Sequence, residues 1–363
     1  MSFASQAHIR ALDSKPRLAL DLLPFVSVVV PCRNEERYIR NCLSSIGNND
    51  YPKERLEVMV VDGMSSDRTR QIVKEVAAGS ASMRIIDNLK YSIPAAMNLG
   101  IRNARGEVIL KIDAHSTYPS DYISQCIRFL HEYDADDVGG VLRIMPGDEG
   151  AVARAIAQTL SHLFGSGNAP VKVGSKDVGW SDSAAFGCFK KKVFETVGLW
   201  NEDLAGSSDF DFNVRLRKAG GRILLVPSIQ IDYFADRNLG SFWSHNFSDG
   251  VWATYVLKFR SEGWAVRHWV PLAFVSSLIG SAAIALFIPA VWWGFFTIAG
   301  VYLTANLAAS LQLSHQAQSL KSTPISMMAF ASRHVAHGLG ALFGLFMVIL
   351  PGKHWQGRRR ARI

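Results

Sequence analysis

The sequence predicts an α/β domain followed by helices that lie on and cross a membrane. Short β-branched segments alternate with amphipathic helical stretches through the first two-thirds of the 363 residues. Apolar residues make up 48% of the chain and are concentrated after about residue 268. The alternation predicts a sheet built from right-handed strand-helix-strand crossovers, and long apolar stretches are typical of membrane segments. The chain is long enough for one large domain and a separate C-terminal module.

The first unit begins at residues 26–31 (VSVVVP), a β-branched run that fits a buried parallel strand better than a helix. A helix is predicted over 35–46, because Ile39, Leu43 and Ile46 recur at helical spacing. The pattern repeats with strands at 57–62, 83–86 and 107–112 and helices at 68–78, 92–104 and 120–131. The second half is less regular, with strands at 138–144, 184–190 and 222–226, helices at 151–164 and 209–219, and a loop at 165–179. We expect Pro227 to end the last strand.

The C-terminal third predicts helices on and in a membrane. Residues 237–265 mix aromatic and charged side chains, a composition typical of interfacial helices. Residues 269–289 and 291–311 contain no Asp, Glu, Lys or Arg and are long enough to span a bilayer. A third segment, 327–350, carries Arg333, His334 and His337, and such side chains are costly at membrane depth unless they face protein, water or headgroups. This segment is therefore either a full span or a partly interfacial or re-entrant helix.

These patterns give five predicted parts. They are an N-terminal extension at 1–24, the α/β domain at 25–236, interfacial linker helices at 237–267, a transmembrane module at 268–351 and a basic tail at 352–363. The net charge of +8 includes this tail, which follows an apolar stretch and indicates attraction to anionic lipid rather than to nucleic acid. The N-terminus has no secretory signal pattern, so we expect the α/β domain to remain in the cytoplasm.

The four cysteines are scattered and form no C-x-x-C pair. They are Cys32, Cys42, Cys126 and Cys188. Neither a disulfide framework nor a structural zinc site is indicated.

Acidic residues follow two of the predicted strands. Asp62 and Asp113 each end an apolar strand, and two carboxylates at one edge of a sheet can hold a divalent cation and a nucleotide. A strand-end Asp also often caps a turn or helix, and for Asp62 the two roles are equally common. Asp113 and His115 alternate along an extended backbone, so their side chains can point to one place and share a metal.

Four ordered motifs carry a family resemblance. They are P-C-R-N-E at 31–35, V-D-G-M-S-S-D at 61–67, A-A-M-N-L-G at 95–100 and D-A-H at 113–115. In order and spacing they resemble the family-two inverting glycosyltransferases of the GT-A fold, a Rossmann-like nucleotide-binding mixed sheet flanked by helices. Within that family the sequence is similar to the ExoA-like, succinoglycan-type membrane transferases, which have D-A-H where others have D-x-D. The resemblance covers about residues 25–240.

The resemblance implies a nucleotide-sugar site. Its residues would be Pro31, Arg33, Asn34, Glu35, Asp62, Asn98, Lys111 and Asp113. Asp62 would accept a hydrogen bond from the base, and Asp113 with His115 would hold Mg²⁺ or Mn²⁺ on the diphosphate. Arg33 and Lys111 would reach phosphate, although an exposed salt bridge is the commoner role for such cations.

Asp209 is the candidate general base of the transfer. It stands in S-D-F-D at 208–211 and matches the aspartate of the family's E-D motif, with Ser208 in place of the glutamate. The alternative is that Asp209 and Asp211 are acids favoured by the dipole at a helix N-terminus. The family match favours catalysis for Asp209, whereas Asp211 is expected to orient local structure or the acceptor pocket.

Three further residues are expected on the acceptor or diphosphate side. Trp180 could stack on a sugar ring, although a packed core tryptophan is the commoner case. Asp182 follows it, and Arg237 matches a basic position that the family places near diphosphate. The Q-x-x-R-W signature of processive synthases is absent, which argues against a long-chain polymerase.

The sequence therefore predicts a metal-dependent, inverting transfer of one sugar at the cytoplasmic face of a bacterial inner membrane. The expected donor is a UDP-linked sugar and the expected acceptor a polyprenyl-linked oligosaccharide in glycan assembly. One alternative is a polyprenyl-phosphate glycosyltransferase, and another is a non-catalytic nucleotide-binding subunit. Expected partners are membrane lipid and other glycan-assembly enzymes, and no nucleic acid.

Overall fold

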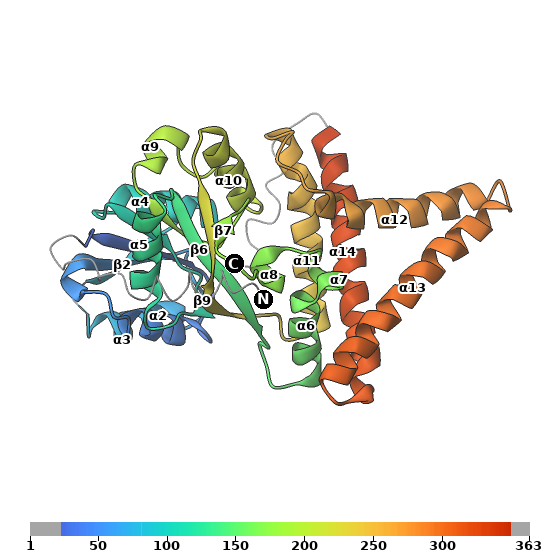
Figure 1. The fold of residues 1–363 in the computed structure, drawn as a ribbon, viewed down its shortest axis with the longest axis horizontal. Coiled ribbons are helices and arrows are strands. Elements are labelled where there is room, and N and C mark those ends of the chain that lie inside the picture. Colours follow the sequence, from blue (N-terminus) through green and yellow to red (C-terminus); the bar gives the residue numbers. More distant parts are fainter. Residues whose placement is uncertain (1–22, 81, 350–363) are drawn as a thin grey trace.

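The computed structural model describes residues 23–80 and 82–349. An α/β domain forms one end of the molecule, and long helices form the other (Figure 1). The predicted N-terminal extension, except for its last two residues, and the predicted basic tail lie outside the described residues.

Nine strands in the described part of the chain form one mixed sheet. They are β1 Val26–Cys32, β2 Leu56–Asp62, β3 Met83–Asp87, β4 Val108–Lys111, β5 Ser116–Thr117, β6 Asp137–Met145, β7 Gly179–Trp180, β8 Ala185–Lys190 and β9 Ile223–Phe234. Their order is β3-β2-β1-β4-β8-β6-β9-β5, with β7 pairing with β9. Strands β1 to β4 are parallel, and β8 runs antiparallel between β4 and β6. The predicted α/β class is confirmed, and the carboxyl ends of β2, β1 and β4 share one edge.

The sequence pattern predicted that Pro227 ends the last strand, and this prediction is wrong. Strand β9 continues to Phe234, and the register between β6 and β9 shifts between Gly139 and Val141. The residues around Pro227 occupy this bulge, where the missing backbone N–H of proline costs no ladder hydrogen bond. The strand thereby carries its second half onward to the D-A-H motif, where Ser116 pairs with Tyr233.

Helices cover both faces of the sheet. The helices of the α/β domain are α2 Ile39–Gly47, α3 Thr69–Ala77, α4 Ile93–Asn103, α5 Tyr122–Glu132, α6 Ala151–Ser161, α7 Leu163–Ser166, α8 Pro170–Val173, α9 Val193–Val197 and α10 Ser208–Lys218. Alternate residues of β1 enter different cores: Val28 packs with α2 and α5, and Val29 packs with α4 and α10. Because successive side chains of a strand point to opposite faces, a continuous apolar strand such as β1 requires this two-sided cover.

Two predicted elements of the domain have different bounds. The helix expected from residue 35 begins at Ile39, after a turn in which the Tyr38 N–H donates to the Glu35 carbonyl. The helix expected over 151–164 breaks at His162, which has an extended backbone and accepts a hydrogen bond from the Phe164 N–H. The region expected to be a loop contains the short helix α8.

Four long helices follow the domain: α11 Leu239–Tyr255, α12 Val266–Ala285, α13 Val291–Gln316 and α14 Thr323–Ile349. Within the described residues, α12, α13 and the segment Leu320–Ile349 are long and apolar enough to cross a membrane. Helix α14 runs beside α11, whereas α12 and α13 project away from that pair (Figure 1). Helices α11 and α14 touch at Gly250 of α11, where a Cβ atom would lie 2.0 Å from the carbonyl oxygen of His337 in α14.

Candidate active site

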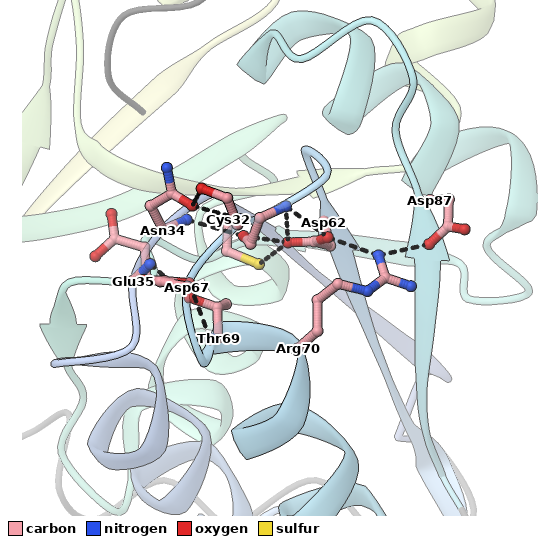
Figure 2. Close-up of polar contacts among 10 residues, drawn as sticks. Cys32, Asn34, Glu35, Asp62, Asp67, Thr69, Arg70 and Asp87 are labelled. Atoms are coloured by element: carbon pink, nitrogen blue, oxygen red, sulfur yellow. Dashed lines mark hydrogen bonds and ion pairs between the residues drawn. The ribbon is translucent and has the colours of Figure 1, made fainter.

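The loops after β1 and β2 are joined by hydrogen bonds at the carboxyl edge of the sheet (Figure 2). Asn34 has a φ of 57°, a left-handed conformation that asparagine tolerates better than most residues. Its Oδ1 accepts from the Ser66 N–H at 2.8 Å, and its own N–H donates to Ser65 Oγ at 2.9 Å. The first and second motifs therefore form one structure.

Asp62 is the centre of this joined loop. Its carboxylate accepts hydrogen bonds from the Ser65 N–H and hydroxyl and pairs with Arg70 at 2.7 Å (Figure 2). Arg70 also pairs with Asp87 at the end of β3, at 2.8 Å. Asp62 is 1% exposed. It therefore organises the turn, as the capping alternative predicted, and its contact with a base stays a prediction.

The other predicted residues of the first motif surround this turn. Pro31 lies opposite Val61 in the β1–β2 pairing. The guanidinium of Arg33 lies over the Tyr91 ring, 4.9 Å from its centroid. Glu35 is buried, and its N–H donates to Thr69 Oγ1 at 2.7 Å.

The D-A-H motif brings Asp113, His115 and Glu35 together. The Nδ1 atom of His115 lies 2.8 Å from Asp113 Oδ1 and 3.3 Å from Glu35 Oε1. Burial alone would lower the pKa of His115, but the Asp113 carboxylate, Tyr233 and the hydrogen bond to Glu35 together outweigh burial and raise it well above its usual value. Burial acts to raise the pKa of Asp113, and His115 outweighs it in the other direction, so that pKa is lowered. The carboxyl is therefore ionised and the imidazole acts as a hydrogen-bond donor.

Asp113 and Glu35 suit a cation that is bound jointly by the protein and by the substrate, and not by the protein alone. Within residues 23–80 and 82–349, no three His, Cys, Asp or Glu side chains are arranged to hold a metal ion. Mg²⁺ is usually bound by one or two carboxylates, substrate phosphates and water. The ionised Asp113 carboxylate fits that role, and Glu35 is the second carboxylate within reach of the motif. His115 turns its Nδ1 toward both acids, so it orients them.

Asp209 lies beside the D-A-H strand. Its Oδ2 atom is 2.5 Å from the Nζ of Lys111, and its Oδ1 accepts a hydrogen bond from Trp200 Nε1 at 3.0 Å. Lys111 is 12% exposed at its side chain and Asp209 is 57% exposed. The pair is therefore anchored at the lysine and open to solvent at the carboxylate. The position of Asp209 at the first turn of α10 also agrees with the dipole alternative, so geometry alone allows both roles.

Asn98 holds the segment that carries Trp200. The Asn98 side chain donates to the Trp200 carbonyl and to Glu202, each at 2.9 Å, and accepts from the Trp200 N–H at 2.9 Å. The indole of Trp200 stacks on Phe212, with centroids 4.3 Å apart. The amide of Asn98 is thus engaged by protein, and its predicted contact with donor sugar stays a prediction. Trp200 is a site residue that sequence reasoning missed.

A cavity of about 280 Å³ opens beside Asp209 and Lys111. Its wall includes Asp182 from the segment before β8 and Arg267 and His268 from the first turn of α12. Asp182 and Arg267 form an ion pair of 2.7 Å. The candidate base therefore faces a space that the catalytic domain and the first apolar helix enclose together.

Asp137 forms part of the same wall and was also missed. It is 2% exposed, and its Oδ1 has no hydrogen-bond partner among the described residues. Burial, reinforced by the charge of Asp209, raises the pKa of Asp137 well above its usual value. A Cβ atom at Gly187 would lie 2.4 Å from that oxygen, so the carboxyl requires glycine beside it. The sequence signal was an acid immediately before the glycine-rich strand V-G-G.

Three predicted residues lie outside this cavity. Asp211 is buried and pairs with Arg215 at 2.9 Å and with Arg260 at 2.6 Å, so it has the local structural role that was expected as one alternative. Trp180 is 52% exposed, with Arg222 over its ring, and is not a core residue. Arg237 is exposed in the loop after β9.

The chain is similar to known proteins over the region that contains these motifs. Residues 27–195 match the model of the glycosyl transferase family 2. Glycosyltransferase AglE of Haloferax volcanii is 30% identical over 259 residues, 70% of this chain and 82% of that protein. Succinoglycan biosynthesis protein ExoA of Rhizobium meliloti is 26% identical over 317 residues, 86% of this chain and 92% of that protein.

Among solved structures, the mannosyltransferase PcManGT from Pyrobaculum calidifontis, in complex with GDP-Man and Mn²⁺, superimposes with a TM-score of 0.56. It is 20% identical in sequence, and the match covers 93% of each chain. The predicted GT-A fold is confirmed by this likeness and by the mixed sheet. With the shared motifs, the matches show that this chain is a glycosyltransferase and belongs to glycosyltransferase family 2.

Proposed function

We propose that the enzyme transfers one sugar, with inversion, from a nucleotide-sugar to a polyprenyl-linked oligosaccharide at a membrane surface. The observation that supports this most directly is the cavity in which Asp209 of the catalytic domain faces Arg267 and His268 of an apolar helix. An acceptor that is anchored in lipid can enter such a space from the membrane side. Anchoring also brings the acceptor hydroxyl and the donor together in the headgroup plane.

On the donor side, the joined loop of Asn34, Ser65 and Ser66 would enclose the nucleotide, with Asp62 beneath it. Asp113, assisted by Glu35 and oriented by His115, would hold Mg²⁺ or Mn²⁺ on the diphosphate. The divalent cation would neutralise the charge that develops on the leaving nucleoside diphosphate. The GDP-Man and Mn²⁺ complex of the structural neighbour supports a divalent metal. The nucleotide that we expect from the family resemblance is UDP.

On the acceptor side, Asp209 would take the proton of the attacking hydroxyl. The new bond to the anomeric carbon forms on the face opposite the leaving diphosphate, and the old bond to the phosphate oxygen breaks. The ion pair with Lys111 and the hydrogen bond from Trp200 hold the carboxylate in place for this step. A positioned general base typically contributes about 10²- to 10⁴-fold to the rate.

The name of one relative supports a lipid-linked acceptor. It is a dolichyl N-acetyl-α-D-glucosaminyl phosphate glucuronosyltransferase of Methanococcus voltae, which is 28% identical over 269 residues, 70% of this chain and 80% of that protein. This name describes transfer to a sugar that is already attached to lipid phosphate. We therefore place a bare polyprenyl phosphate second as the acceptor. The name of ExoA, a succinoglycan biosynthesis protein, supports a role in glycan assembly.

The membrane arrangement that we propose has α12 and α13 inserted as a hairpin, with the catalytic domain on the cytoplasmic face. Helix α14 would lie along the surface beside α11, as the partly interfacial alternative has it. Its charged residues then remain next to protein instead of lipid tails.

A transfer assay with purified full-length enzyme tests the proposal. We expect sugar transfer to a lipid-linked saccharide to exceed transfer to bare polyprenyl phosphate. Asp209→Asn should lower kcat by at least about 100-fold, while Asp203→Asn, an exposed aspartate in the preceding loop, should leave it unchanged. Full activity of the Asp209→Asn enzyme would exclude Asp209 as the base.

A further inference from the structure

The charged face of α14 is turned toward the catalytic domain. Arg333 Nε donates to the Gly165 carbonyl at 2.6 Å, and its Nη1 donates to the side chain of Asn246. His334 Nε2 lies 2.9 Å from the Phe164 carbonyl. These partners belong to α7 and α11, so Arg333 and His334, two of the three basic residues in the third apolar segment, contact protein.

The partners of Arg333 are neutral oxygens. Among the described residues, no carboxylate forms an ion pair with its guanidinium. One turn further along α14, His337 Nδ1 is buried and has no hydrogen-bond partner in the part of the chain that the structure describes. The side chain of Arg333 is half-buried, so its guanidinium has lost part of its hydration without gaining an ion pair.

Lys172 adds a second unpaired cation. It lies on α8, which sits between the sheet and α11, next to α7 (Figure 1). Its ammonium has no hydrogen-bond or ion-pair partner among the described residues. Burial lowers the pKa of Lys172 to about 8, the charge of Arg333 acts in the same direction, and Asp249 acts against it. Lys172 and Arg333 are thus close enough to repel each other, although the lysine is still protonated at neutral pH.

The nearby acids are already engaged. Asp236 lies 3.0 Å from His245 Nδ1, and Asp249 lies 3.7 Å from His245 Nε2. The charge of Asp249 raises the pKa of His245, and the hydrogen bond that His245 donates to Asp236 acts in the same direction. His245 therefore balances part of this acidic charge, and Lys172 and Arg333 have no carboxylate of their own.

Lys172, Arg333 and His337, the basic cluster, are connected to the D-A-H motif through Asp236 and His245. The ring of Tyr233 is 4.9 Å from the ring of His115, and three residues later Asp236 pairs with His245 of α11. Three extended residues span about 10 Å. His245, whose pKa the charge of Lys172 acts to lower, is thus a short step from the place where the donor diphosphate is proposed to bind.

We propose that Lys172, Arg333 and His337 bind the phosphate or diphosphate group of the lipid-linked acceptor. The inference rests on the proposed function and adds the group by which that acceptor is recognised. A guanidinium and an ammonium are the side chains that phosphate oxygens pair with most strongly, and His337 Nδ1 supplies a further polar atom. The position between α8, α11 and α14 selects a phosphate at the end of an isoprenoid chain over the headgroups of the bulk bilayer, which would meet a lipid-facing surface.

A binding measurement on the full-length protein in detergent tests this site, with farnesyl diphosphate as the probe. EDTA is present, so that metal-mediated binding of the probe at Asp113 is excluded. We expect Lys172→Gln to weaken binding about tenfold, the loss of one charge-assisted hydrogen bond. Lys176→Gln removes an exposed lysine from the same segment and should bind like wild type. Arg333→Lys, which keeps the charge but loses the planar fork, should weaken binding as well.

Three comparison probes define the ligand: farnesol, inorganic pyrophosphate and phosphatidylglycerol. Weak binding of all three would support the site as proposed. Equal binding of pyrophosphate would make it a site for free phosphate, and equal competition by phosphatidylglycerol would make it a site for ordinary anionic lipid; either result overturns the proposal. It is also overturned if wild type does not bind farnesyl diphosphate, or if Lys172→Gln binds it like wild type.

The same samples distinguish this inference from the proposed function. Nucleotide-sugar binding with Mn²⁺ should be unchanged in Lys172→Gln. If nucleotide-sugar binds but the farnesyl diphosphate results fail, only the phosphate site is wrong. If no nucleotide-sugar binds to wild type, the proposed function itself fails.

Discussion

The Nζ of Lys111 lies 2.5 Å from Oδ2 of Asp209, so an ion pair joins the strand that leads into the D-A-H motif to the first turn of α10. The two residues are 98 positions apart in sequence. This pair connects the proposed metal-binding motif and the proposed base, which must act on opposite sides of one sugar carbon.

Removing the lysine should disturb catalysis more than binding. In Lys111→Gln the Asp209 carboxylate loses its ionic partner and can turn from the acceptor hydroxyl, and we expect kcat to fall roughly 100-fold. Lys190→Gln, which breaks the Lys190–Asp134 ion pair elsewhere in the sheet, is the matched control and should leave kcat unchanged. Steady-state kinetics that showed a raised KM with normal kcat would assign Lys111 to substrate binding only.

The indole of Trp200 should matter through its N–H. Trp200→Phe keeps an aromatic ring against Phe212 but removes the hydrogen bond to Asp209, and we expect kcat to fall about tenfold. Trp180→Phe should have no effect, because Trp180 is not part of the cavity wall. A loss of activity in Trp180→Phe would instead support the acceptor wall that the sequence suggested.

Asp137 should make stability depend on pH. The pKa of an ordinary carboxyl is about 4, and the pKa of Asp137 is raised by burial and by the charge of Asp209. Between these two pKa values the folded protein retains a proton that the unfolded chain has lost, so stability falls as pH rises through this window. Asp137→Asn is neutral throughout, and its melting temperature relative to wild type should rise with pH. A constant difference between pH 5 and pH 8 would show that Asp137 is ionised in the folded protein.

Asp211 should contribute to stability. Asp211→Asn leaves Arg215 and Arg260 without their shared carboxylate in a largely buried position, and we expect a loss of about 3 kcal/mol in the free energy of unfolding. Glu262→Gln breaks an ion pair with Lys218 that is about half exposed, and should cost less than about 1 kcal/mol. Thermal unfolding in detergent compares the two, and equal losses would contradict a structural role for Asp211.

Much of the fold was predictable because it depends on local patterns. The apolar strands β1, β2 and β4 and the amphipathic helices between them follow from periodicity, and the acids at their ends follow from the α/β architecture. The continuation of β9 past Pro227 was not predictable, because the bulge that accommodates the proline depends on the register with β6.

The motifs of the site could be predicted from the sequence, but the contacts between their residues could not. No local pattern pairs Lys111 with Asp209, or leaves the carboxyl of Asp137 without a partner against Gly187. The sequence left the roles of Asp62 and Asp211 open. An acid that follows a strand or begins a helix can cap a turn, pair with a neighbouring side chain or bind a ligand. Arg70 follows Asp62 on the next helix, whereas Arg260, a partner of Asp211, is 49 residues away and only the fold brings it near.

The most direct test is a thermal-shift titration of the full-length enzyme with nucleotide-sugars, with and without Mn²⁺. A donor bound to the folded state raises the melting temperature, by an amount set by its concentration relative to Kd. We expect at least one nucleotide-sugar to stabilise wild type and Asp209→Asn only when Mn²⁺ is present, and to lose that effect in Asp113→Asn but not in the exposed variant Asp148→Asn. If no nucleotide-sugar shifts wild type, with or without metal, the proposed donor site is wrong.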